Sequence, residues 1–495
     1  MIVAVVAETN SAAVAARLGS LAGPPWAGHV TAEVRLDTLA DPDVAIAALS
    51  GAGVPVLATC RRLQDGGAWR GTEDGRRALL QAAFEGNVEA IDVETDVLAD
   101  LPFARGDRVV ASFHDFNATP DGLDETIARA FDAGAGCVKL ATRANDLTDL
   151  LRLRRAVDSA EHPDRVTAFA LGPVGIASRI LFRRMGADRV YAHATDAGGP
   201  ELAPGLPSLS DLAGLYYADA TLSAPIAGFG VLGDRATDSI GPTVFNRIFR
   251  GRGVPATYVP ITAPSTIGLR EAMRLLGIRG LSVTIPHKEA ALTLADDVHD
   301  LATRIGAANT LVFEEGRLRA FNTDYHGVLE PVRDARMASQ ARAGEAVVLG
   351  AGGAARAAAA ALSDLGLKTR ICSRTADRAI AAASALGVEA GPVPTEPPAV
   401  LVNATPVGGL RDPDGIPVPA SALGPGQVVL EMNYLPADTP LLRAAREAGG
   451  VAIDGAAMFS VQARHQLHHF WAGLPDLKGE IEETVRWAIE QRASS

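Results

Sequence analysis

Short runs rich in β-branched and aliphatic residues alternate with longer stretches of helical period through the first 220 residues of the chain. The longer stretches are rich in Ala, Leu and Arg, as in ETIARAFDAG and TDLLRLRRAVDSA. This alternation predicts short buried strands separated by helices. The strand-like runs are IVAVVAE, HVTAEVRLD, VPVLATCR, EAIDVE, RVVASFHDF, GCVKLAT, RVTAFALG and RVYAHAT. Eight strands alternating with helices favour an α/β fold of the (β/α)8 barrel type, with a doubly wound open sheet as the alternative.

Polar side chains gather where these strand-like runs end. In a (β/α)8 barrel the carboxyl ends of all the strands meet at one rim, and functional side chains come from that rim. We therefore expect a site there, built from Glu33, Arg35, Arg61, Asp92, Glu94, His114, Asp115 and Lys139.

Lys139 has the most distinctive chemistry of this set. Lysine occurs only at positions 139, 288, 368 and 478, while arginine supplies the other 42 of the 46 basic residues. A guanidinium stays protonated near neutral pH, so chemistry that needs a free amine must keep a lysine. We expect the apolar run around Lys139 to leave part of its amine uncharged, as imine formation with a ketone requires. With His114 as general acid and base, the pair predicts elimination of water β to a carbonyl.

Four segments of this half resemble those of type I 3-dehydroquinate dehydratases: 33–37 (EVRLD), 112–116 (SFHDF), 138–141 (VKLA) and 175–179 (GIASR). The resemblance covers roughly residues 1–215. It implies that Lys139 forms a Schiff base with the substrate and that His114 removes and returns the proton. It also implies that the substrate, whose carboxylate suits arginine, is held by Glu33, Arg35, Arg61 and Arg179.

The chain departs from this family at two places. The family usually has Glu-Gly-Gly where this chain has Asp65-Gly66-Gly67, which shortens a carboxylate side chain. The family's closing loop usually reads Ser-Ala-Pro-Gly-Gln, and residues 202–206 read LAPGL here. Two polar substrate contacts are therefore expected to be replaced by Leu202 and Leu206.

The second half begins a new α/β series. The first pattern breaks around residues 218–225 and is followed by IAGFGVLG. Further on, the strand-like run EAVVLG leads directly into a glycine-rich turn and an alanine-rich helix, with another strand at 368–373. This order predicts a Rossmann-type domain in which the backbone approaches a pyrophosphate at the helix N-terminus. The expected cofactor contacts in the turn are Gly350, Gly352, Gly353, Ala354 and Ala355.

The end of the next strand indicates which dinucleotide binds. It reads Ser373-Arg374-Thr375, with Arg378 close behind. NAD-binding domains usually place an acidic residue here for the ribose hydroxyls, whereas arginines suit a 2′-phosphate. The sequence therefore predicts NADP as the cofactor.

Segments around this turn resemble shikimate dehydrogenases over roughly residues 225–490: 282–288 (SVTIPHK), 306–310 (GAANT), 322–324 (NTD), 403–406 (NATP), 433–434 (NY) and 455–462 (GAAMFSVQ). The resemblance implies that Lys288 and Asp324 form the catalytic pair, with the lysine protonating or stabilising the developing alkoxide. The family's Ser-x-Ser-Pro loop has Gly241 in place of its second serine here. The resemblance further implies substrate contacts at Ser239, Thr284, Asn309, Tyr434 and Gln462, and cofactor contacts at Asn403 and Thr405.

The two halves in this order resemble fused dehydratase–dehydrogenases, in which the product of one site is the substrate of the other. We expect a barrel at 1–220, a substrate domain at 221–330, a cofactor domain at 331–450, and C-terminal helices at 451–495 that return to the substrate domain. The expected partners are small molecules: 3-dehydroquinate, 3-dehydroshikimate or shikimate, and NADP.

Composition and charge narrow the class of protein further. A hydrophobic fraction of 48% and 50 glycines fit a compact α/β enzyme. The net charge of −12, without a basic stripe, argues against nucleic acid as a partner. No stretch approaches the ~20 apolar residues of a membrane span, and the N-terminus lacks the basic region of a signal peptide. Three scattered cysteines indicate a reducing compartment, expected to be the cytoplasm, and offer no metal-ligand spacing.

Two rival functions remain open at this point. A quinate or related polyol dehydrogenase carrying the same barrel would keep Lys288, Asn309 and Asp324, because its ligand has a similar ring. A non-catalytic regulator that senses shikimate or quinate would explain the lost polar groups at Leu202, Leu206 and Gly241. Both lysines and His114 are retained, and an acidic chain shows no DNA-binding segment, which favours the enzyme.

Overall fold

The computed structural model describes residues 1–49, 51–86, 88–195, 203–217, 227–338 and 344–494. The chain divides into two compact units. The first consists of Met1–Gly228, Asp234–Thr237 and Pro255–Ile278, and the second of Phe229–Gly233, Asp238–Val254 and Arg279–Ser495. Leu202 and the domain boundary expected at 220/221 lie outside the described residues. The four-part division expected from the sequence stays a prediction.

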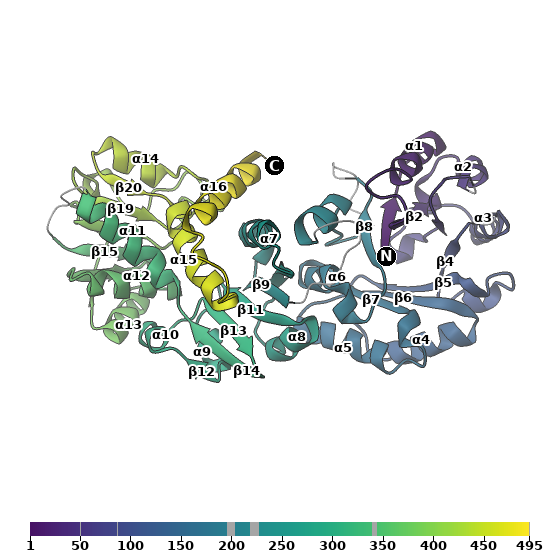
Figure 1. The fold of residues 1–495 in the computed structure, drawn as a ribbon, viewed down its shortest axis with the longest axis horizontal. Helices are drawn as coiled ribbons and strands as arrows, with labels where there is room; N and C mark the ends of the chain where they lie inside the picture. Colours follow the sequence, from purple (N-terminus) through teal and green to yellow (C-terminus); the bar gives the residue numbers. More distant parts are fainter. Residues whose placement is uncertain (50, 87, 196–202, 218–226, 339–343, 495) are drawn as a thin grey trace. The chain divides into compact units, whose positions relative to one another are not determined.

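The first unit contains an eight-stranded parallel sheet with the order β7-β6-β5-β4-β3-β2-β1-β8 (Figure 1). From β1 to β7 each strand pairs with the next one in the chain, and β8 returns to pair with β1. This cyclic order confirms the predicted barrel, which among the described residues has no hydrogen-bonded pairing between β7 and β8. The strands are β1 (Ile2–Val6), β2 (Val30–Arg35), β3 (Val56–Thr59), β4 (Ala90–Glu94), β5 (Gly106–Asp115), β6 (Ala135–Arg143), β7 (Val166–Leu171) and β8 (Val190–His193).

Helices follow most of these strands, as the alternating pattern predicts. Helix α5 begins with a capping box, in which Asp146 and Asp149 accept each other's backbone N–H groups. The connection from β4 to β5 differs from the pattern, because it holds only a short 3₁₀ turn at Leu98–Asp100. The helices are α1 (Ser11–Leu21), α2 (Pro42–Leu49), α3 (Glu73–Glu85), α4 (Leu123–Asp132), α5 (Leu147–Asp158) and α6 (Ile176–Ile180).

The interior of the barrel is apolar beneath its rim. Successive residues of a strand point to opposite faces, so alternate positions of each strand fill the interior. One buried cluster contains Val3, Val5, Leu57, Val110, Ala141, Phe169, Leu171 and Tyr191.

A second, mixed sheet has the strand order β10-β9-β11-β13-β14-β12. Its pairs β11–β13 and β13–β14 are antiparallel, and β12–β14 is parallel. The strands are β9 (Ala227–Gly233), β10 (Ala256–Thr262), β11 (Ile278–Val283), β12 (Asp297–Val298), β13 (Thr310–Glu314) and β14 (Arg317–Phe321). The helices of this region are α7 (Gly241–Gly251), α8 (Leu269–Leu276), α9 (Ala290–Leu294) and α10 (Asp300–Ile305).

The third sheet is parallel, with the order β17-β16-β15-β18-β19-β20. Counted from its first strand this is 3-2-1-4-5-6, the Rossmann order, which confirms the predicted cofactor-type fold. The strands are β15 (Ala346–Leu349), β16 (Thr369–Cys372), β17 (Glu389–Ala390), β18 (Val400–Asn403), β19 (Val428–Glu431) and β20 (Val451–Ile453). The helices are α11 (Asp324–Ala338), α12 (Gly353–Asp364), α13 (Ala376–Leu386), α14 (Pro440–Glu447), α15 (Gly455–Phe470) and α16 (Lys478–Ser494).

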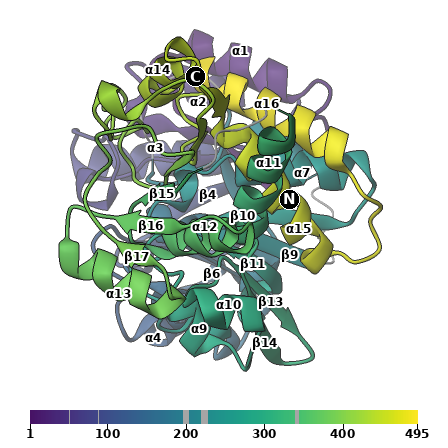
Figure 2. The same cartoon turned by 90° about the vertical axis from the view of Figure 1, so that its left-hand side faces the viewer.

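Alanine lets α12 lie close to this sheet (Figure 2). Ala355 and residues 357–361, all alanines, are buried in one core cluster with Val348 of β15 and Val402 of β18. Small side chains shorten the distance between helix and strands, which brings the N-terminus of α12 to the end of β15. The alanine-rich sequence therefore positions the glycine turn.

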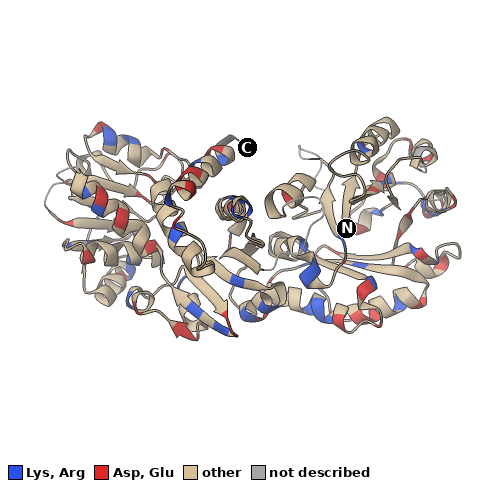
Figure 3. Cartoon of the chain, in the orientation of Figure 1, with Lys and Arg blue, Asp and Glu red and all other residues tan. Residues whose placement is uncertain are grey.

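No helix in the part of the chain that the structure describes combines the length and the apolar character needed to cross a membrane. Basic and acidic positions are interspersed on the helices of both units (Figure 3).

Candidate active sites

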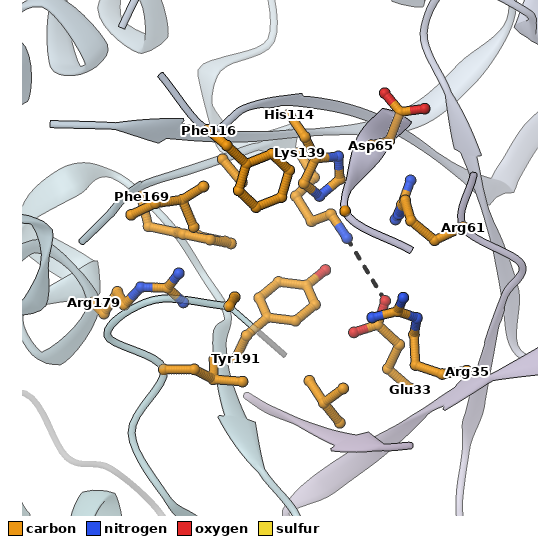
Figure 4. A pocket seen from close by; sticks show the side chains of 16 residues that line it. Glu33, Arg35, Arg61, Asp65, His114, Phe116, Lys139, Phe169, Arg179 and Tyr191 are labelled. Carbon is orange, nitrogen blue, oxygen red and sulfur yellow. Dashed lines mark ion pairs between the residues drawn. The ribbon is translucent and has the colours of Figure 1, made fainter. Parts of the chain in front are cut away.

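A pocket opens at the carboxyl ends of the barrel strands, and Figure 4 shows the side chains that line it. It holds about 510 Å³ of space not filled by atoms, part of it open to solvent. The structure brings together there all six barrel residues that the sequence assigns to catalysis or substrate binding: Glu33, Arg35, Arg61, His114, Lys139 and Arg179.

Lys139 is buried beside carboxylates. Its Nζ lies 2.5 Å from Asp92 Oδ2 and 3.7 Å from Glu33 Oε1. The expectation that Lys139 has an apolar setting is therefore wrong, because its apolar sequence neighbours Val138 and Leu140 point to the other face of β6.

Asp92 is the centre of a buried charge cluster. Its Oδ1 accepts hydrogen bonds from Arg61 Nη2 and from Ser112 Oγ, both at 2.6 Å. Burial alone would raise the pKa of Asp92, but the Arg61 guanidinium and the Lys139 ammonium hold that pKa well below its usual value. Asp92 therefore keeps a negative charge that fixes Lys139 and Arg61 in place.

His114 is neutral near physiological pH. Burial, followed by the positive charges of Arg61 and Lys139, lowers its pKa well below the usual 6.5. Its ring is stacked on Phe116 with 6.2 Å between ring centroids, and its Nδ1 has no hydrogen-bond partner among the described residues. A neutral imidazole with an unused nitrogen beside Lys139 is equipped to accept a proton.

Arg179 carries a buried positive charge without a counter-ion among the described residues. Its Nε donates to the Ala170 carbonyl (3.1 Å), its guanidinium lies 4.5 Å from the centroid of the Phe169 ring, and its Nη2 has no partner in the described ranges. Burial lowers the pKa of Arg179 to about 9, so the group still carries its charge at neutral pH. An anionic group of a ligand would satisfy both the charge and the free donor.

Two other charged residues of the pocket, Arg35 and Glu33, are already engaged with the protein. Arg35 donates to both oxygens of Asp37 at 2.9 and 2.7 Å, and Glu33 Oε1 accepts from Thr59 Oγ1 at 2.8 Å. Asp65 and Leu206, two positions where the chain departs from the dehydratase pattern, also line the pocket.

Lys288 and Asp324 face each other in the second unit. Lys288 Nζ lies 2.5 Å from Asp324 Oδ2, with Lys288 on the turn after β11 and Asp324 at the start of α11. Asn309 Nδ2 donates to Asp324 Oδ1 (2.7 Å) and to Gln462 Oε1 (3.1 Å). The structure thus joins four predicted residues from distant parts of the sequence into one polar network.

Ser239 and Tyr434 also lie together. The Tyr434 hydroxyl is hydrogen-bonded to the Ser239 side chain, and Ser239 Oγ accepts from the backbone N–H of Gly241 at 3.0 Å. Thr284 is half-buried at the end of β11, where its backbone N–H donates to the Leu232 carbonyl at 2.9 Å.

The glycine turn depends on residues without a side chain. Gly350 has φ = +115°, and a Cβ there would lie 2.9 Å from the Ala404 carbonyl oxygen. A Cβ on Gly353 would lie 3.1 Å from the Lys288 Cβ, whereas Gly352 faces open space where α12 begins. Because first-turn N–H groups lack partners within a helix, a phosphate fits there. The predicted contacts that lie together are Gly350, Gly352, Gly353, Ala354 and Ala355.

Four further predicted cofactor residues follow β16. Ser373 is half-buried, while Arg374, Thr375 and Arg378 are exposed. Within the described ranges neither arginine forms an ion pair with a carboxylate, which leaves both free for a phosphate.

Asn403 uses its whole side chain inside the protein. Its Nδ2 donates to both oxygens of Glu431 (3.0 and 2.9 Å), and its Oδ1 accepts from the backbone N–H and the hydroxyl of Thr405 (3.0 and 2.7 Å). It therefore helps to fix the turn that carries Thr405, and its contact with a cofactor stays a prediction.

Sequence reasoning gives no role to two residues that touch Lys139. It marks Asp92 only as a strand end, and it passes over Tyr191, whose ring centroid lies 4.8 Å from Lys139 Nζ. A lone aromatic residue within the eighth strand-like run is the available signal for Tyr191.

A cluster of His326, Glu330 and His465 is also not foreseen from the sequence. Their potential ligand atoms lie within 4.8 Å of one another. Arg464 and His465 both pair with Glu330, so an internal ion pair accounts for this cluster.

Known proteins match both halves of the chain. The family model of type I 3-dehydroquinase matches residues 27–223, and that of the shikimate dehydrogenase substrate binding domain matches residues 231–311. The NADP(+) shikimate dehydrogenase of Natronomonas pharaonis is 40% identical over 270 residues, 53% of this chain and 99% of that protein. The solved dehydroquinate dehydratase and shikimate dehydrogenase from S. pombe AroM covers 98% of each chain at 21% identity, with a TM-score of 0.44.

The chloroplastic bifunctional 3-dehydroquinate dehydratase/shikimate dehydrogenase of Arabidopsis thaliana spans both halves at once. It is 32% identical over 449 residues, which are 85% of this chain and 74% of the plant protein. The chain therefore belongs to the family of bifunctional 3-dehydroquinate dehydratase/shikimate dehydrogenases.

Proposed function

We propose that the barrel site dehydrates 3-dehydroquinate to 3-dehydroshikimate and that the site around Lys288 reduces this product to shikimate with NADPH. The observation that carries the first half is a buried lysine beside a neutral histidine in a pocket with an unpaired arginine. Family membership supports the pairing of the two activities on one chain.

The dehydration uses Lys139 as nucleophile. Its neutral amine attacks the ketone carbon, and loss of one water with uptake of one proton gives an imine cation. The same proton is released again when the imine is hydrolysed in the last step. His114 takes a proton from the adjacent ring carbon, and the hydroxyl β to the imine carbon leaves as water with the proton that His114 returns. One water then hydrolyses the imine, which releases the enone and regenerates the amine. The net change is the loss of one water.

The substrate carboxylate is assigned to Arg179, the pocket cation without a counter-ion among the described residues. Arg61 and Arg35 are held by Asp92 and Asp37, so we assign to them and to Glu33 the orientation of ring hydroxyls. This division follows from which charges are already balanced within the protein.

The reduction uses Lys288 and Asp324. When bound, NADPH supplies a hydride to the ketone carbon. The Lys288 ammonium gives a proton to the developing alkoxide, and Asp324 holds that ammonium in place. We assign the ring hydroxyls to Gln462 and Asn309, whose amides are hydrogen-bonded to each other in the same network. The ring's other polar groups are assigned to Ser239, Thr284 and Tyr434.

The cofactor is NADP, in line with the NADP(+) dependence named for the relatives of the second half. We propose that Arg374 and Arg378 hold its 2′-phosphate, because both are exposed and carry no ion pair within the described ranges. Arg374→Asp should lower the catalytic efficiency with NADPH by roughly ten- to hundredfold and leave that with NADH nearly unchanged, since it removes a charge-assisted bond and adds repulsion. Equal efficiencies of the parent protein with NADPH and NADH would contradict this assignment.

We also propose a reducing compartment, the cytoplasm, as the location of this chain. Cys60, Cys137 and Cys372 are all free thiols, two of them buried.

One assay of the purified chain tests the proposed function. Absorbance of the enone should rise when 3-dehydroquinate is added alone, and NADPH should then be consumed in equal amount when it follows. The rates at which the protein oxidises quinate and shikimate with NADP show whether the second site prefers quinate, as a quinate dehydrogenase would. Absence of enone formation by folded protein would refute the first activity, and absence of NADPH consumption the second.

A further inference from the structure

Tyr191 places a buried hydroxyl in the dehydratase pocket. It lies on β8, opposite Val3 of β1, and only 4% of its surface is exposed. Its hydroxyl oxygen has no hydrogen-bond partner among the described residues. A buried hydroxyl without a partner is unfavourable, so proteins retain one where something else supplies the bond.

The ring of Tyr191 lies beside the reacting amine. The centroid of the Tyr191 ring lies 5.4 Å from the centroid of the Phe169 ring and 4.8 Å from Lys139 Nζ. Figure 4 shows the ring in the middle of the pocket, with its hydroxyl end pointing to the side where Lys139 and Glu33 lie. The hydroxyl therefore faces the space that a ligand attached to Lys139 occupies.

Unpaired polar atoms gather in this pocket. Seven buried side-chain atoms lack a partner in the part of the chain that the structure describes, and three of them line this one pocket: His114 Nδ1, Arg179 Nη2 and the Tyr191 hydroxyl. His114 is explained by proton transfer and Arg179 by the carboxylate. The third atom has no role in the mechanism above.

We propose that the Tyr191 hydroxyl binds the substrate, donating a hydrogen bond to a substrate oxygen near the Lys139 amine. This assignment rests on the proposed dehydration. Burial and the carboxylates of Glu33 and Asp92 raise the pKa of Tyr191 well above 10. The phenol therefore stays protonated and acts as a neutral donor, and proton abstraction is left to His114.

This donor also compensates for the apolar side of the pocket. Ala203 and Leu206 form part of the lining and offer no polar side chain to a hydroxylated ring. Tyr191 on β8 lines the same pocket and supplies a polar atom to it.

Tyr191→Phe tests the assignment, because it removes the hydroxyl and keeps the ring. The KM for 3-dehydroquinate should rise about five- to twentyfold, the loss of one hydrogen bond to a substrate oxygen, while kcat changes less than about twofold. The melting temperature should stay equal or rise, since an unpaired buried hydroxyl is removed from the unliganded protein.

Tyr217→Phe is the matched control. Tyr217 is buried in the same unit, but its hydroxyl donates to the Ile180 carbonyl. Its removal should lower the melting temperature and leave KM unchanged, the opposite pattern. NADPH-dependent reduction of 3-dehydroshikimate gives a further reference that neither change should alter.

An unchanged KM in Tyr191→Phe, with normal dehydration by the parent protein, would overturn the assignment and leave the proposed function standing. A fall in kcat at constant KM would overturn it as well. Absence of dehydration in the parent protein would instead refute the proposed function itself.

Discussion

The two candidate sites treat their lysines differently. Lys139 is 4% exposed and contacts two carboxylates inside a cluster that also holds Arg61. Lys288 is 15% exposed and, among the described residues, pairs with one carboxylate, Asp324, which accepts a hydrogen bond from the Asn309 amide. A nucleophilic lysine has to lose its proton, and a general acid has to keep it until the alkoxide forms. The buried cluster therefore suits a group whose charge changes when the ligand binds, and the more open pair suits a group that renews its proton from solvent.

The largest effect is expected when the lysine of each site is replaced by arginine, because the two reactions use the lysine amine differently. Lys139→Arg should abolish dehydration, by about three orders of magnitude or more, because a guanidinium keeps both its charge and its proton. Lys288→Arg should slow reduction by about a hundredfold or more, because the charge remains but proton donation is lost. Each variant should retain the other activity, and the two spectrophotometric assays measure both. Loss of both activities in either variant would break the comparison.

The second prediction concerns stability. Asp92→Asn should lower the free energy of unfolding by about 3 kcal/mol, because it leaves Arg61 and Lys139 buried with less counter-charge. Asp324→Asn should cost less, about 1–2 kcal/mol, because the partner Lys288 reaches solvent. Urea unfolding of the parent protein and of each variant measures both changes in the free energy of unfolding. Asp297→Asn, in an exposed pair with Arg317, is the control and should change stability by less than about 1 kcal/mol.

The third prediction is that dehydration at the first site depends little on pH between 7.0 and 5.5, because His114 stays neutral over that range. Its pKa lies below 6.5, so the imidazole remains the neutral base at pH values where an ordinary histidine is charged. At pH 5.5 the charged form of an ordinary histidine would outnumber its neutral form about tenfold. We expect kcat/KM for dehydration to change less than about twofold between pH 7.0 and 5.5. A tenfold fall over that range would show that His114 titrates normally or is not the base.

The smallest expected effects come from the loops. Restoring polar groups by Leu206→Gln in the barrel and Gly241→Ser in the second unit should each tighten substrate binding by about two- to tenfold, the value of one hydrogen bond. The KM of each site measures the change. If neither substitution tightens binding, other groups already satisfy the substrate, and Tyr191 is one such group in the barrel.

Much of the fold was predictable because its patterns are local. Eight strand-like runs and a glycine turn between a strand and an alanine-rich helix are read from neighbouring residues, and the structure confirms both sheets that they predict. The site was less predictable, because strand register decides which distant side chains meet. Asp92 reaches Lys139 from two strands away, and Tyr191 faces Lys139 across the interior of the barrel. Neither contact has a signature in the spacing of residues along the chain.

Asn403 illustrates a different limit of sequence reasoning. Resemblance placed it at the cofactor, and the structure gives its amide to Glu431 and Thr405. The motif does not reveal that this side chain holds the turn, which the folded contacts show, and its contact with the cofactor stays a prediction.

The central claim is that Lys139 becomes covalently attached to the substrate, and borohydride trapping tests it most directly. Borohydride added during turnover of 3-dehydroquinate should reduce the imine and add ligand mass to a peptide that contains Lys139, with loss of dehydration in proportion to the modified fraction. The Lys139→Arg protein, treated in the same way, should gain no mass. If the parent protein dehydrates the substrate but acquires no adduct at Lys139, the Schiff-base account of this pocket is contradicted.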